Sequence, residues 1–331
     1  MPAKSVLMSV TFAIASVTGM ASAKPVITTF DPLGSTDTYV FSINDAGALT
    51  GYYVDSNFAY HGFVRAPDGT ITAFDPSGSV YTIANGINSA GAIAGGYWDS
   101  TGAGHGYVRA PDGTITSFDV SGARGTTANA INRAGAIAGN YTDGSFVVHG
   151  FVRAVDGTVA TFDPSGSIFT VANSINDKGA IVGFYEDSNH VDHGFVREPD
   201  GTITAFDPQG SSSTKATGIN SSGSIVGSYD YMNKSERGFV RAPDGTITPF
   251  DPKGAYTVAA GINRGGAITG GHDDRSGIER GFERTPAGKF RTFAPSGSTD
   301  AGGNAINDKD SVAGNYDDNN LVSHGFVRSG R

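Results

Sequence analysis

The stretch FDPSGSVYTIANGINSAGAIAGGYWDSTGAGHGYVRAPDGTIT, from Phe74 to Thr116, decides the fold because the chain contains seven close variants of it. The aromatic residue that opens each copy recurs at intervals of 44 residues, once 43, at Phe30, Phe74, Phe118, Phe162, Phe206, Phe250 and Phe293. A fixed period of this size is the sequence signature of repeat architectures such as solenoids and propellers. The chain is therefore expected to build one structural unit seven times.

One copy is expected to contain four short β-strands. Small, β-branched and aromatic residues alternate with turn signals such as Pro111-Asp112-Gly113, which is typical of antiparallel hairpins. The predicted strands of this copy are Thr82–Ile87, Ala92–Trp98, His105–Ala110 and Thr114–Asp119. Four antiparallel strands form one propeller blade. We therefore predict an all-β, seven-bladed β-propeller.

The turn between the first and second strands has the pattern N-x-x-G. Its Asn recurs at Asn44, Asn88, Asn132, Asn176, Asn220, Asn263 and Asn307. A Gly follows three residues later in six copies, and Asp310 takes its place in the seventh. An Asn side chain stabilises such a turn and Gly accepts the positive φ, so we interpret this column as structural.

The first strand of each copy is expected to line the propeller axis, where seven blades crowd together. Ala, Ser, Gly and Asn fit there, whereas Phe would not. The third strand of every copy carries an aromatic residue, which we expect between the blades, and it ends in an Arg that we also interpret as structural. That Arg column is Arg65, Arg109, Arg153, Arg197, Arg241, Arg284 and Arg328.

The two ends of the repeat region are incomplete in complementary ways. It begins with a lone fourth strand, Val26–Asp31, and ends after a lone third strand, His324–Arg328. An open solenoid would need distinctive capping repeats, which this sequence lacks. The N-terminal strand is therefore expected to complete the last blade and close the ring.

The first 23 residues have the features of a secretory signal peptide. Lys4 precedes the apolar run Ser5–Val17, and Ala21-Ser22-Ala23 is an A-x-A cleavage site. Residues 24–331 then form a single propeller domain, secreted or periplasmic, with no membrane span after removal of the signal. The formal net charge of −9 disfavours nucleic acid as a partner. The absence of Cys excludes thiol catalysis and thiolate metal sites.

The string I-N-x-x-G-x-I-x-G-x-Y, followed by H-G-F and a D-G turn, resembles the bacterial extracellular repeats of the HAF family. The resemblance covers essentially the whole mature chain, but His-Ala-Phe is replaced here by His-Gly-Phe or, at Arg237 and Arg280, by Arg-Gly-Phe. It implies export and little agreed activity. The segment DGTITAF is also weakly similar to streptogramin-lyase propellers.

An acidic column lies six residues before a basic one in six copies. The pairs are Asp55 with His61, Asp99 with His105, Asp143 with His149, Asp187 with His193, Asp274 with Arg280, and Asp318 with His324. Arg can neither bind a metal nor give up its proton, so acid–base and metal roles are disfavoured. We predict that each pair ties a loop to its third strand or to the Asp of the F-D-P motif. We predict no metal or other cofactor, while calcium at the Asp-rich loops stays open.

Function is expected on the more variable of the two faces, which carries the fourth-to-first and second-to-third connections. Function concentrates on variable loops over a rigid frame. The candidate ligand-binding residues are Tyr60, Tyr81, Trp98, Phe146, His190 and Tyr231, with Phe58, Phe169 and Met232 as further loop residues. Aromatic side chains of this kind suit sugar faces and peptide grooves.

The preferred function is an exported, monomeric binding propeller for an extracellular glycan or protein, with avidity from repeated weak sites. The first alternative is a lyase- or hydrolase-like enzyme with one pocket at the axis on the variable face. The second alternative is a structural scaffold. No catalytic residue set is identified from the sequence.

Overall fold

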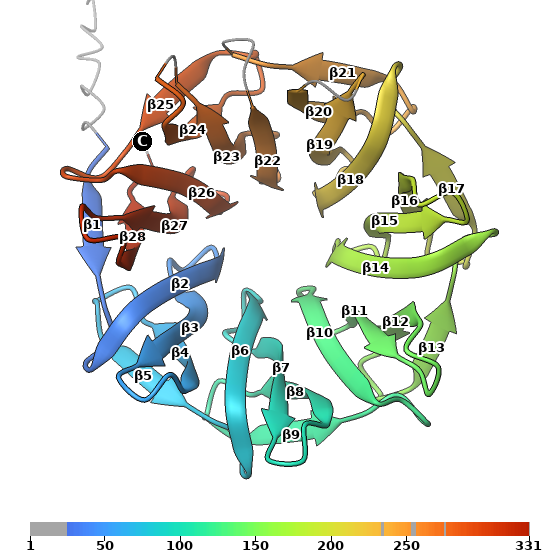
Figure 1. The fold of residues 1–331 in the computed structure, drawn as a ribbon, viewed down its shortest axis with the longest axis horizontal. Helices are drawn as coiled ribbons and strands as arrows, with labels where there is room; N and C mark the ends of the chain where they lie inside the picture. The colour runs from blue at the N-terminus through green and yellow to red at the C-terminus, as the bar shows by residue number, and fades with distance from the viewer. Residues whose placement is uncertain (1–24, 233–234, 253–255, 275, 331) are drawn as a thin grey trace, which may run out of the picture.

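The computed structural model describes residues 25–232, 235–252, 256–274 and 276–330. Within them the chain forms 28 β-strands and no helix. The strands pair in groups of four, and Figure 1 shows these groups around a central axis, an arrangement that fits a propeller of seven blades. The signal peptide predicted for residues 1–23 lies outside the described residues. No helix in the described part is long and apolar enough to cross a membrane.

The position of each strand in its blade repeats around the ring. The first, innermost strands are β2 (Ser35–Ile43), β6 (Ser79–Ile87), β10 (Gly125–Ile131), β14 (Ser167–Ile175), β18 (Ser211–Ile219), β22 (Thr257–Ile262) and β26 (Asp300–Ile306). The second strands are β3 (Leu49–Asp55), β7 (Ile93–Asp99), β11 (Ile137–Thr142), β15 (Ile181–Asp187), β19 (Ile225–Tyr231), β23 (Ile268–Asp273) and β27 (Val312–Asp317).

The outer half of each blade consists of the third and fourth strands. The third strands are β4 (Tyr60–Arg65), β8 (Gly104–Arg109), β12 (Val148–Arg153), β16 (Asp192–Arg197), β20 (Ser235–Arg241), β24 (Glu279–Arg284) and β28 (Ser323–Arg328). The fourth strands are β5 (Ile71–Phe74), β9 (Ile115–Phe118), β13 (Val159–Phe162), β17 (Ile203–Phe206), β21 (Ile247–Phe250), β25 (Phe290–Phe293) and β1 (Ile27–Phe30).

The strand boundaries differ from the sequence-based prediction mainly at the first strand. In the second blade β6 begins at Ser79, three residues before the predicted start at Thr82. Its register against β7 shifts twice, between Ser79 and Tyr81 and between Ala84 and Gly86. Each shift marks a β-bulge, after which the pairing with β7 resumes. The strand therefore extends further toward the fourth-to-first connection than the sequence predicted.

The N-terminal strand pairs with the last strand, as the incomplete end copies predicted. Strand β1 runs antiparallel to β28, with Ile27 opposite Arg328 and Thr28 opposite Val327. Figure 1 shows the two strands side by side where the blue and red ends of the chain meet. His324 Nδ1 also lies 2.8 Å from Asp31 Oδ2. The closing blade is therefore built from both ends of the chain.

Aromatic residues fill the space between blades. The third-strand aromatic is fully buried in every blade, from Phe63 to Phe326. It meets the Phe of a neighbouring blade's fourth strand edge to face, as in the pair Phe30–Phe63 at 6.1 Å between ring centroids. The same geometry recurs between all seven blades. Such pairs add about 0.5–1.5 kcal/mol each beyond area burial.

The Arg that ends the third strand packs on the same fourth-strand Phe and so strengthens the contact between the two blades. The Arg65 guanidinium carbon lies 4.8 Å from the centroid of the Phe30 ring, and the other six copies repeat this contact at 4.9–5.0 Å. Each Arg of this column therefore packs on an aromatic ring of the preceding blade. A cation–π contact of this kind contributes about 0.5–2 kcal/mol, more when it is desolvated.

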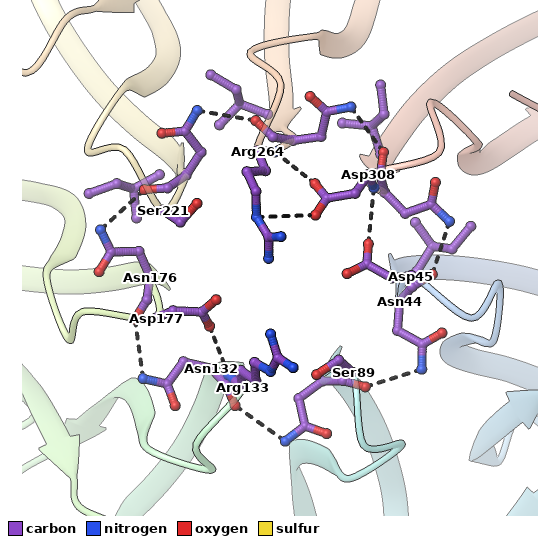
Figure 2. Close-up of a pocket in the computed structure, with 18 of the residues that line it drawn as sticks. Asn44, Asp45, Ser89, Asn132, Arg133, Asn176, Asp177, Ser221, Arg264 and Asp308 are labelled. Carbon is purple, nitrogen blue, oxygen red and sulfur yellow. Dashed lines mark hydrogen bonds and ion pairs between the residues drawn. The ribbon is translucent and has the colours of Figure 1, made fainter. Parts of the chain in front are cut away.

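The Asn of each N-x-x-G turn links its blade to the next around the axis. Each Asn Nδ2 donates to the backbone carbonyl of the following Asn, from Asn44 to Asn88 and finally from Asn307 back to Asn44, at 3.0–3.2 Å. Figure 2 shows these bonds as a ring of dashed lines. Each Oδ1 accepts backbone N–H groups of its own turn, for example that of Ala48 at 3.0 Å. The Asn column is thus a closed, satisfied ring.

A second column of inter-blade bonds lies deeper in the axial channel. Asn85, Asn129, Asn173, Thr217 and Asn304 each donate to a carbonyl of the next blade at 2.7–2.9 Å. In the first and sixth blades this column instead holds Phe41 and Ala260. The expectation that Phe would not fit at the axis is wrong at Phe41, which lines the channel and is 37% exposed. Its ring packs near Tyr52, with the centroids 5.6 Å apart, and remains partly exposed.

Candidate functional site

Two opposite faces carry the blade connections, and we name them by what they contain. The turn face carries the N-x-x-G turns and the turns between third and fourth strands. The loop face carries the second-to-third loops and the fourth-to-first connections. Because successive strands are antiparallel, the start of a first strand, the end of a second and the start of a third all lie on the loop face.

Each predicted Asp–His pair lies at the base of a second-to-third loop. His61 Nδ1 is 2.7 Å from Asp75 Oδ2, of the F-D-P motif, while His61 Nε2 is 3.6 Å from Asp55 Oδ2. The other four His copies have the same two carboxylate neighbours. The Arg280 Nε of the sixth blade lies 3.4 Å from Asp274 Oδ2. The basic side chain thus joins loop, third strand and fourth strand.

The loop Asp of each pair also organises its own loop. Asp55 Oδ1 accepts the backbone N–H groups of Asn57 and Ala59 at 2.8 and 2.9 Å. The backbone N–H of Ala59, followed by that of Asn57, lowers the pKa of Asp55 despite opposing desolvation. In the second blade a hydrogen bond from the Thr101 side chain does most to lower the pKa of Asp99 to about 2. These carboxylates stay ionised and engaged in loop structure.

The calcium expectation concerns the same loops. Their Asp oxygens are directed to backbone N–H groups two and four residues further on. Among the described residues, no group of three or more His, Asp or Glu is placed to hold a metal ion. Calcium binding remains a prediction from the sequence alone.

The tips of these loops hold several predicted ligand residues in a strained backbone conformation. Phe58, Phe146, His190 and Met232 have φ between 52° and 68°, in the left-handed region that bulky residues rarely adopt. Phe58 is 79% exposed and Phe146 70% exposed. In the second and sixth blades the tip is Gly102 or Gly277. The tips lie in separate blades, one to each second-to-third loop.

Three of the predicted residues do come together on the first two blades. Tyr60 of β4 pairs with Tyr81 of β6 where these two strands run parallel, and their rings meet edge to face with centroids 4.8 Å apart. Tyr81 lies opposite Trp98 in the pairing of β6 with β7. The predicted residues Phe146, His190 and Tyr231 belong to the third, fourth and fifth blades, away from this cluster. Tyr231 is covered by the Arg237 guanidinium, 4.0 Å from its ring centroid.

The aromatic cluster continues inward along the first blade. Tyr60 stacks on Tyr52 at 5.1 Å, and Tyr52 stacks on Tyr39 at 4.8 Å between ring centroids. Phe41 lies 5.6 Å from Tyr52. Burial, followed by the neighbouring Tyr39 and Tyr60, raises the pKa of Tyr52 to about 12. The first blade therefore presents a ladder of aromatic rings that leads toward the axis.

A cavity of about 400 Å³ lies at the inner end of this ladder, and we call it the acidic pocket. Tyr39 and Phe41 line one side of it. Three acidic residues are among the rest of its lining: Glu279 at the start of β24, Asp300 at the start of β26 and Asp317 at the end of β27. The pocket thus lies over the seventh blade, between residues of the sixth and first blades.

Glu279 reaches the pocket because two glycines leave room for it. A Cβ at Gly271 would lie 1.8 Å from Glu279 Oε1, and a Cβ at Gly302 would lie 3.2 Å from the same atom. The second blade also has Gly at the position of Gly271, while the other blades place Tyr, Asn, Phe or Ser there. At the position of Gly302 the other blades place Tyr, Ile, Thr, Val or Lys. Gly271 and Gly302 together thus leave the space that the Glu279 carboxyl group occupies.

The carboxyl groups of the pocket disfavour one another's ionisation. Burial raises the pKa of Glu279 to about 7, with further contributions from Asp300, Asp273 and Asp317. Burial and Asp317 also raise the pKa of Asp300. Asp300 Oδ1 is buried and has no hydrogen-bond partner among the described residues. The pocket is an unusually negative part of the loop face.

No Lys or Arg of the described chain pairs with Glu279, Asp300 or Asp317. The contrast with the fourth blade is direct, because Asp192 occupies the same repeat position as Glu279 and its Oδ2 lies 3.3 Å from Lys215 Nζ. In the fifth blade the equivalent Glu236 accepts the Ser228 hydroxyl at 2.6 Å. The sixth-blade copy, Glu279, has neither kind of partner among the described residues and lines the cavity.

Sequence reasoning missed this pocket, although a signal for it was present. The Asp–His columns drew attention because they repeat, whereas Glu279 and Asp300 belong to columns that vary from blade to blade and Phe41 departs from a column that is mostly Asn. A structural demand recurs in every blade of a repeat protein, so a departure that clusters in space points to something other than the fold. The departures could be read from the sequence, but their convergence required the packing of blades one, six and seven.

Comparisons with known proteins show the fold alone. Virginiamycin B lyase from Staphylococcus aureus matches with a TM-score of 0.59 and 15% identity, over 92% of this chain and 99% of that chain. The β-propeller domain of the Trilobed protease from Pyrococcus furiosus matches with a TM-score of 0.63 and 11% identity, over 89% and 96%. Puromycin hydrolase matches with a TM-score of 0.61 and 12% identity, over 86% of this chain and 51% of its own.

No family model and no curated protein matches the sequence. The resemblance to HAF-type repeats therefore remains a prediction from the motif. The chain is an all-β protein similar in architecture to propellers, and its site must be interpreted from its own residues.

Proposed function

We propose that the protein is an exported, monomeric binding propeller whose acidic pocket holds a cationic group of an extracellular glycan, such as the ammonium of an amino sugar. The observation that carries this proposal is the set of three carboxylates around a cavity of about 400 Å³, with aromatic rings on its other side and no described cation nearby. A cation placed there would be attracted both by the carboxylates and by the faces of the rings.

The glycan part of the proposal rests on the aromatic ladder. Tyr39, Tyr52 and Tyr60 form a continuous line of rings from the pocket toward the second blade. Rings of this kind pack well against the apolar faces of sugars, while Asn315 and Ser323 add polar groups at the pocket itself. A chain of several sugars could therefore extend from the pocket along the first two blades.

Calorimetric titration with glucosamine and glucose tests the charge requirement. We expect glucosamine to bind at least about tenfold more tightly than glucose, because a charge-assisted hydrogen bond contributes about 1.5–3 kcal/mol. Glu279→Gln should remove most of this preference. Tyr39→Ile, which installs the second blade's residue Ile83 at this position, should weaken both sugars. Equal binding of glucose and glucosamine, or no binding of either, would contradict the proposal.

The loop tips offer a further, multivalent contribution on the same face. Exposed, strained residues such as Phe58 and Phe146 present apolar contacts from separate blades. Such contacts would strengthen binding of a large or surface-bound glycan, but would not affect a single sugar. Phe58→Gly, matched to Gly102 of the second blade, should therefore weaken polymer binding and leave glucosamine binding unchanged.

A second function, catalysis, is favoured by one observation, the pKa of about 7 for Glu279 beside other carboxyl groups. A carboxyl group with that pKa can act as general acid near neutral pH. Incubation with chitosan oligosaccharides, followed by mass spectrometry, distinguishes the two functions. Cleaved products that disappear in Glu279→Gln would establish an enzyme, whereas an unaltered substrate that stays bound would support the binding protein.

A further inference from the structure

The opposite, turn face has its own cavity, of about 430 Å³, at the mouth of the axial channel. We call it the axial mouth. Its rim is the residue that follows each Asn of the N-x-x-G turns. In chain order these residues are Asp45, Ser89, Arg133, Asp177, Ser221, Arg264 and Asp308. The sequence Ser-Arg-Asp thus occurs twice around the rim, with Asp45 as the additional member.

The backbone under this rim is held rigidly. The closed ring of Asn side chains fixes the spacing between neighbouring turns, so the rim residues do not maintain the turn themselves. Their chemistry varies among acid, base and hydroxyl while the Asn beside them is constant in all seven copies. A column that varies where the Asn ring is constant, and that converges on a cavity, is a candidate for ligand contact.

Two guanidinium groups enter the axial mouth from nearly opposite sides. Figure 2 shows the side chains of Arg133 and Arg264, which lie three blades apart, extending toward each other over the centre of the opening. Arg264 Nε lies 3.4 Å from Asp308 Oδ2, and the Arg264 side chain is 57% exposed. For the Arg133 guanidinium the described residues supply no carboxylate within ion-pair distance. Both groups retain N–H donors directed into the cavity.

The carboxylates are held against the wall of the mouth. Asp177 Oδ1 accepts the backbone N–H of Arg133 at 3.1 Å, and Asp308 Oδ1 accepts that of Arg264 at 2.8 Å. Asp45 Oδ1 accepts the backbone N–H of Asp308 at 3.0 Å. The second oxygen of each carboxylate remains an acceptor at the rim. The mouth therefore offers donors at its centre and acceptors around its edge.

We propose that the axial mouth is a second binding site, which takes a compact carboxylate carrying several hydroxyl groups, of the sugar-acid class. A carboxylate between Arg133 and Arg264 satisfies donors that have no acceptor of their own. Hydroxyl groups spread around it donate to the Asp carboxylates and exchange hydrogen bonds with Ser89 and Ser221. A single ammonium group could reach only one part of a rim whose acids belong to blades one, four and seven.

The residues that line this site also indicate what it excludes. No aromatic ring is among the described residues that line the mouth, so stacking on a sugar face does not contribute. Three carboxylates around two guanidinium groups disfavour a ligand with several negative charges. Recognition depends on one carboxylate and its hydroxyl groups. The site is separate from the acidic pocket and does not rest on the function proposed above.

Calorimetric titration with sodium glucuronate at low ionic strength tests the proposal. Arg133→Ser and Arg264→Ser are matched variants because Ser occupies the same column in two other blades, so we expect their thermal unfolding to stay unchanged. Each should weaken glucuronate binding by at least about tenfold, the effect of losing a charged hydrogen-bond donor. Glu279→Gln, on the loop face, should leave glucuronate binding unchanged.

Comparison ligands decide the chemical class. Glucose should bind at least about tenfold more weakly than glucuronate, since it lacks the carboxylate. Absence of glucuronate binding to the wild-type protein, or unchanged binding to both Arg variants, would overturn the site. Inorganic phosphate or glucose binding as tightly as glucuronate would overturn the sugar-acid assignment. Loss of glucosamine binding in Glu279→Gln, with glucuronate binding retained, separates this site from the acidic pocket.

Discussion

At the scale of single residues, the repeat acts as its own control. Glu283 occupies a column that holds Val in the other six blades, and it is 2% exposed. Its Oε1 lies 2.6 Å from Arg291 Nη1, and its Oε2 lies 2.9 Å from Arg328 Nη1. In the other blades the residue equivalent to Arg328 is partly or wholly buried on a Phe ring without such a carboxylate. The triad of Glu283, Arg291 and Arg328 is therefore an addition to an inter-blade contact that the other blades form without it.

This comparison predicts an asymmetric result for two substitutions. Glu283→Val restores the common residue, so we expect a change in the free energy of unfolding below about 1 kcal/mol. Arg328→Met leaves Glu283 buried with one partner and removes a cation–π contact, and should cost about 3–5 kcal/mol. Denaturant unfolding measures both. The double variant should recover most of the loss, and failure to do so would show that the Arg–Phe contact dominates.

At the scale of elements, much of a blade could be predicted from the sequence. Period, turn residues and the small first strand indicate four strands in order, and the observed strands lie within three residues of the predicted limits in the second blade. The inter-blade role of the Asn turns could not be predicted in this way. The Nδ2 of Asn44 reaches a carbonyl 44 residues away, and local spacing carries no information about which blade lies beside which.

The same limit applies to the candidate sites. The sequence indicated exposed aromatic residues such as Tyr60 and Tyr81 on the loop face, and these do meet. It gave no reason to associate Glu279 with Tyr39, which are far apart in the chain and line one cavity only because the ring closes. Residues that recur in every copy can be found from the sequence. Residues that meet only because the ring of blades closes cannot.

The loop anchors should make stability depend on pH. Burial opposes protonation of His105 and His193, but the hydrogen bonds that they donate to Asp119 and Asp207, and the charge of these carboxylates, outweigh it, so the pKa of each His is raised. The native state then binds the proton more tightly than the unfolded chain, whose His pKa is about 6.5. This stabilisation is complete below that value and is lost as the pH rises through the folded pKa.

Unfolding in denaturant at pH 5.5 and pH 8 measures this contribution. We expect His105→Asn with His193→Asn to reduce the loss of stability between the two values. His105→Arg with His193→Arg should keep the anchor charged at pH 8, as Arg280 does naturally in the sixth blade. Glu279 contributes in the same direction because its pKa is also raised, so each comparison belongs in a Glu279→Gln background. Equal slopes in all variants would contradict the prediction.

At the scale of the whole molecule, ring closure is the feature on which both sites depend. The acidic pocket joins blades six, seven and one, and the axial mouth needs all seven turns. Closure uses strand β1 on β28, the Arg65–Phe30 contact and the hydrogen bond from Asn307 to Asn44. Each of these contacts has an equivalent within or between other blades. The chain ends could therefore lie in another blade at a similar free energy of folding.

A circular permutant tests this equivalence. Ser329 N donates to the Val26 carbonyl at 2.8 Å, as Ala66 N does to the Thr70 carbonyl. A Pro-Asp-Gly linker that joins Ser329 directly to Val26, in place of residues 330 and 25, therefore reproduces the three-residue spacing of the other turns. New ends placed between Asp156 and Gly157 would open the corresponding turn of the third blade. We expect the permutant to keep its β-sheet circular dichroism and both ligand affinities, with a modest fall in melting temperature.

Removal of residues 25–31 is the contrasting variant, because it deletes one strand without replacing it. Loss of the Phe30 side chain alone should cost about 3–5 kcal/mol, and the freed edge of β28 should promote association between copies. Thermal unfolding and size-exclusion chromatography measure the two effects. If the truncated chain proved as stable as the permutant and still bound both ligands, the seventh blade would not require its fourth strand, and closure by β1 would not be what holds the ring and its two sites together.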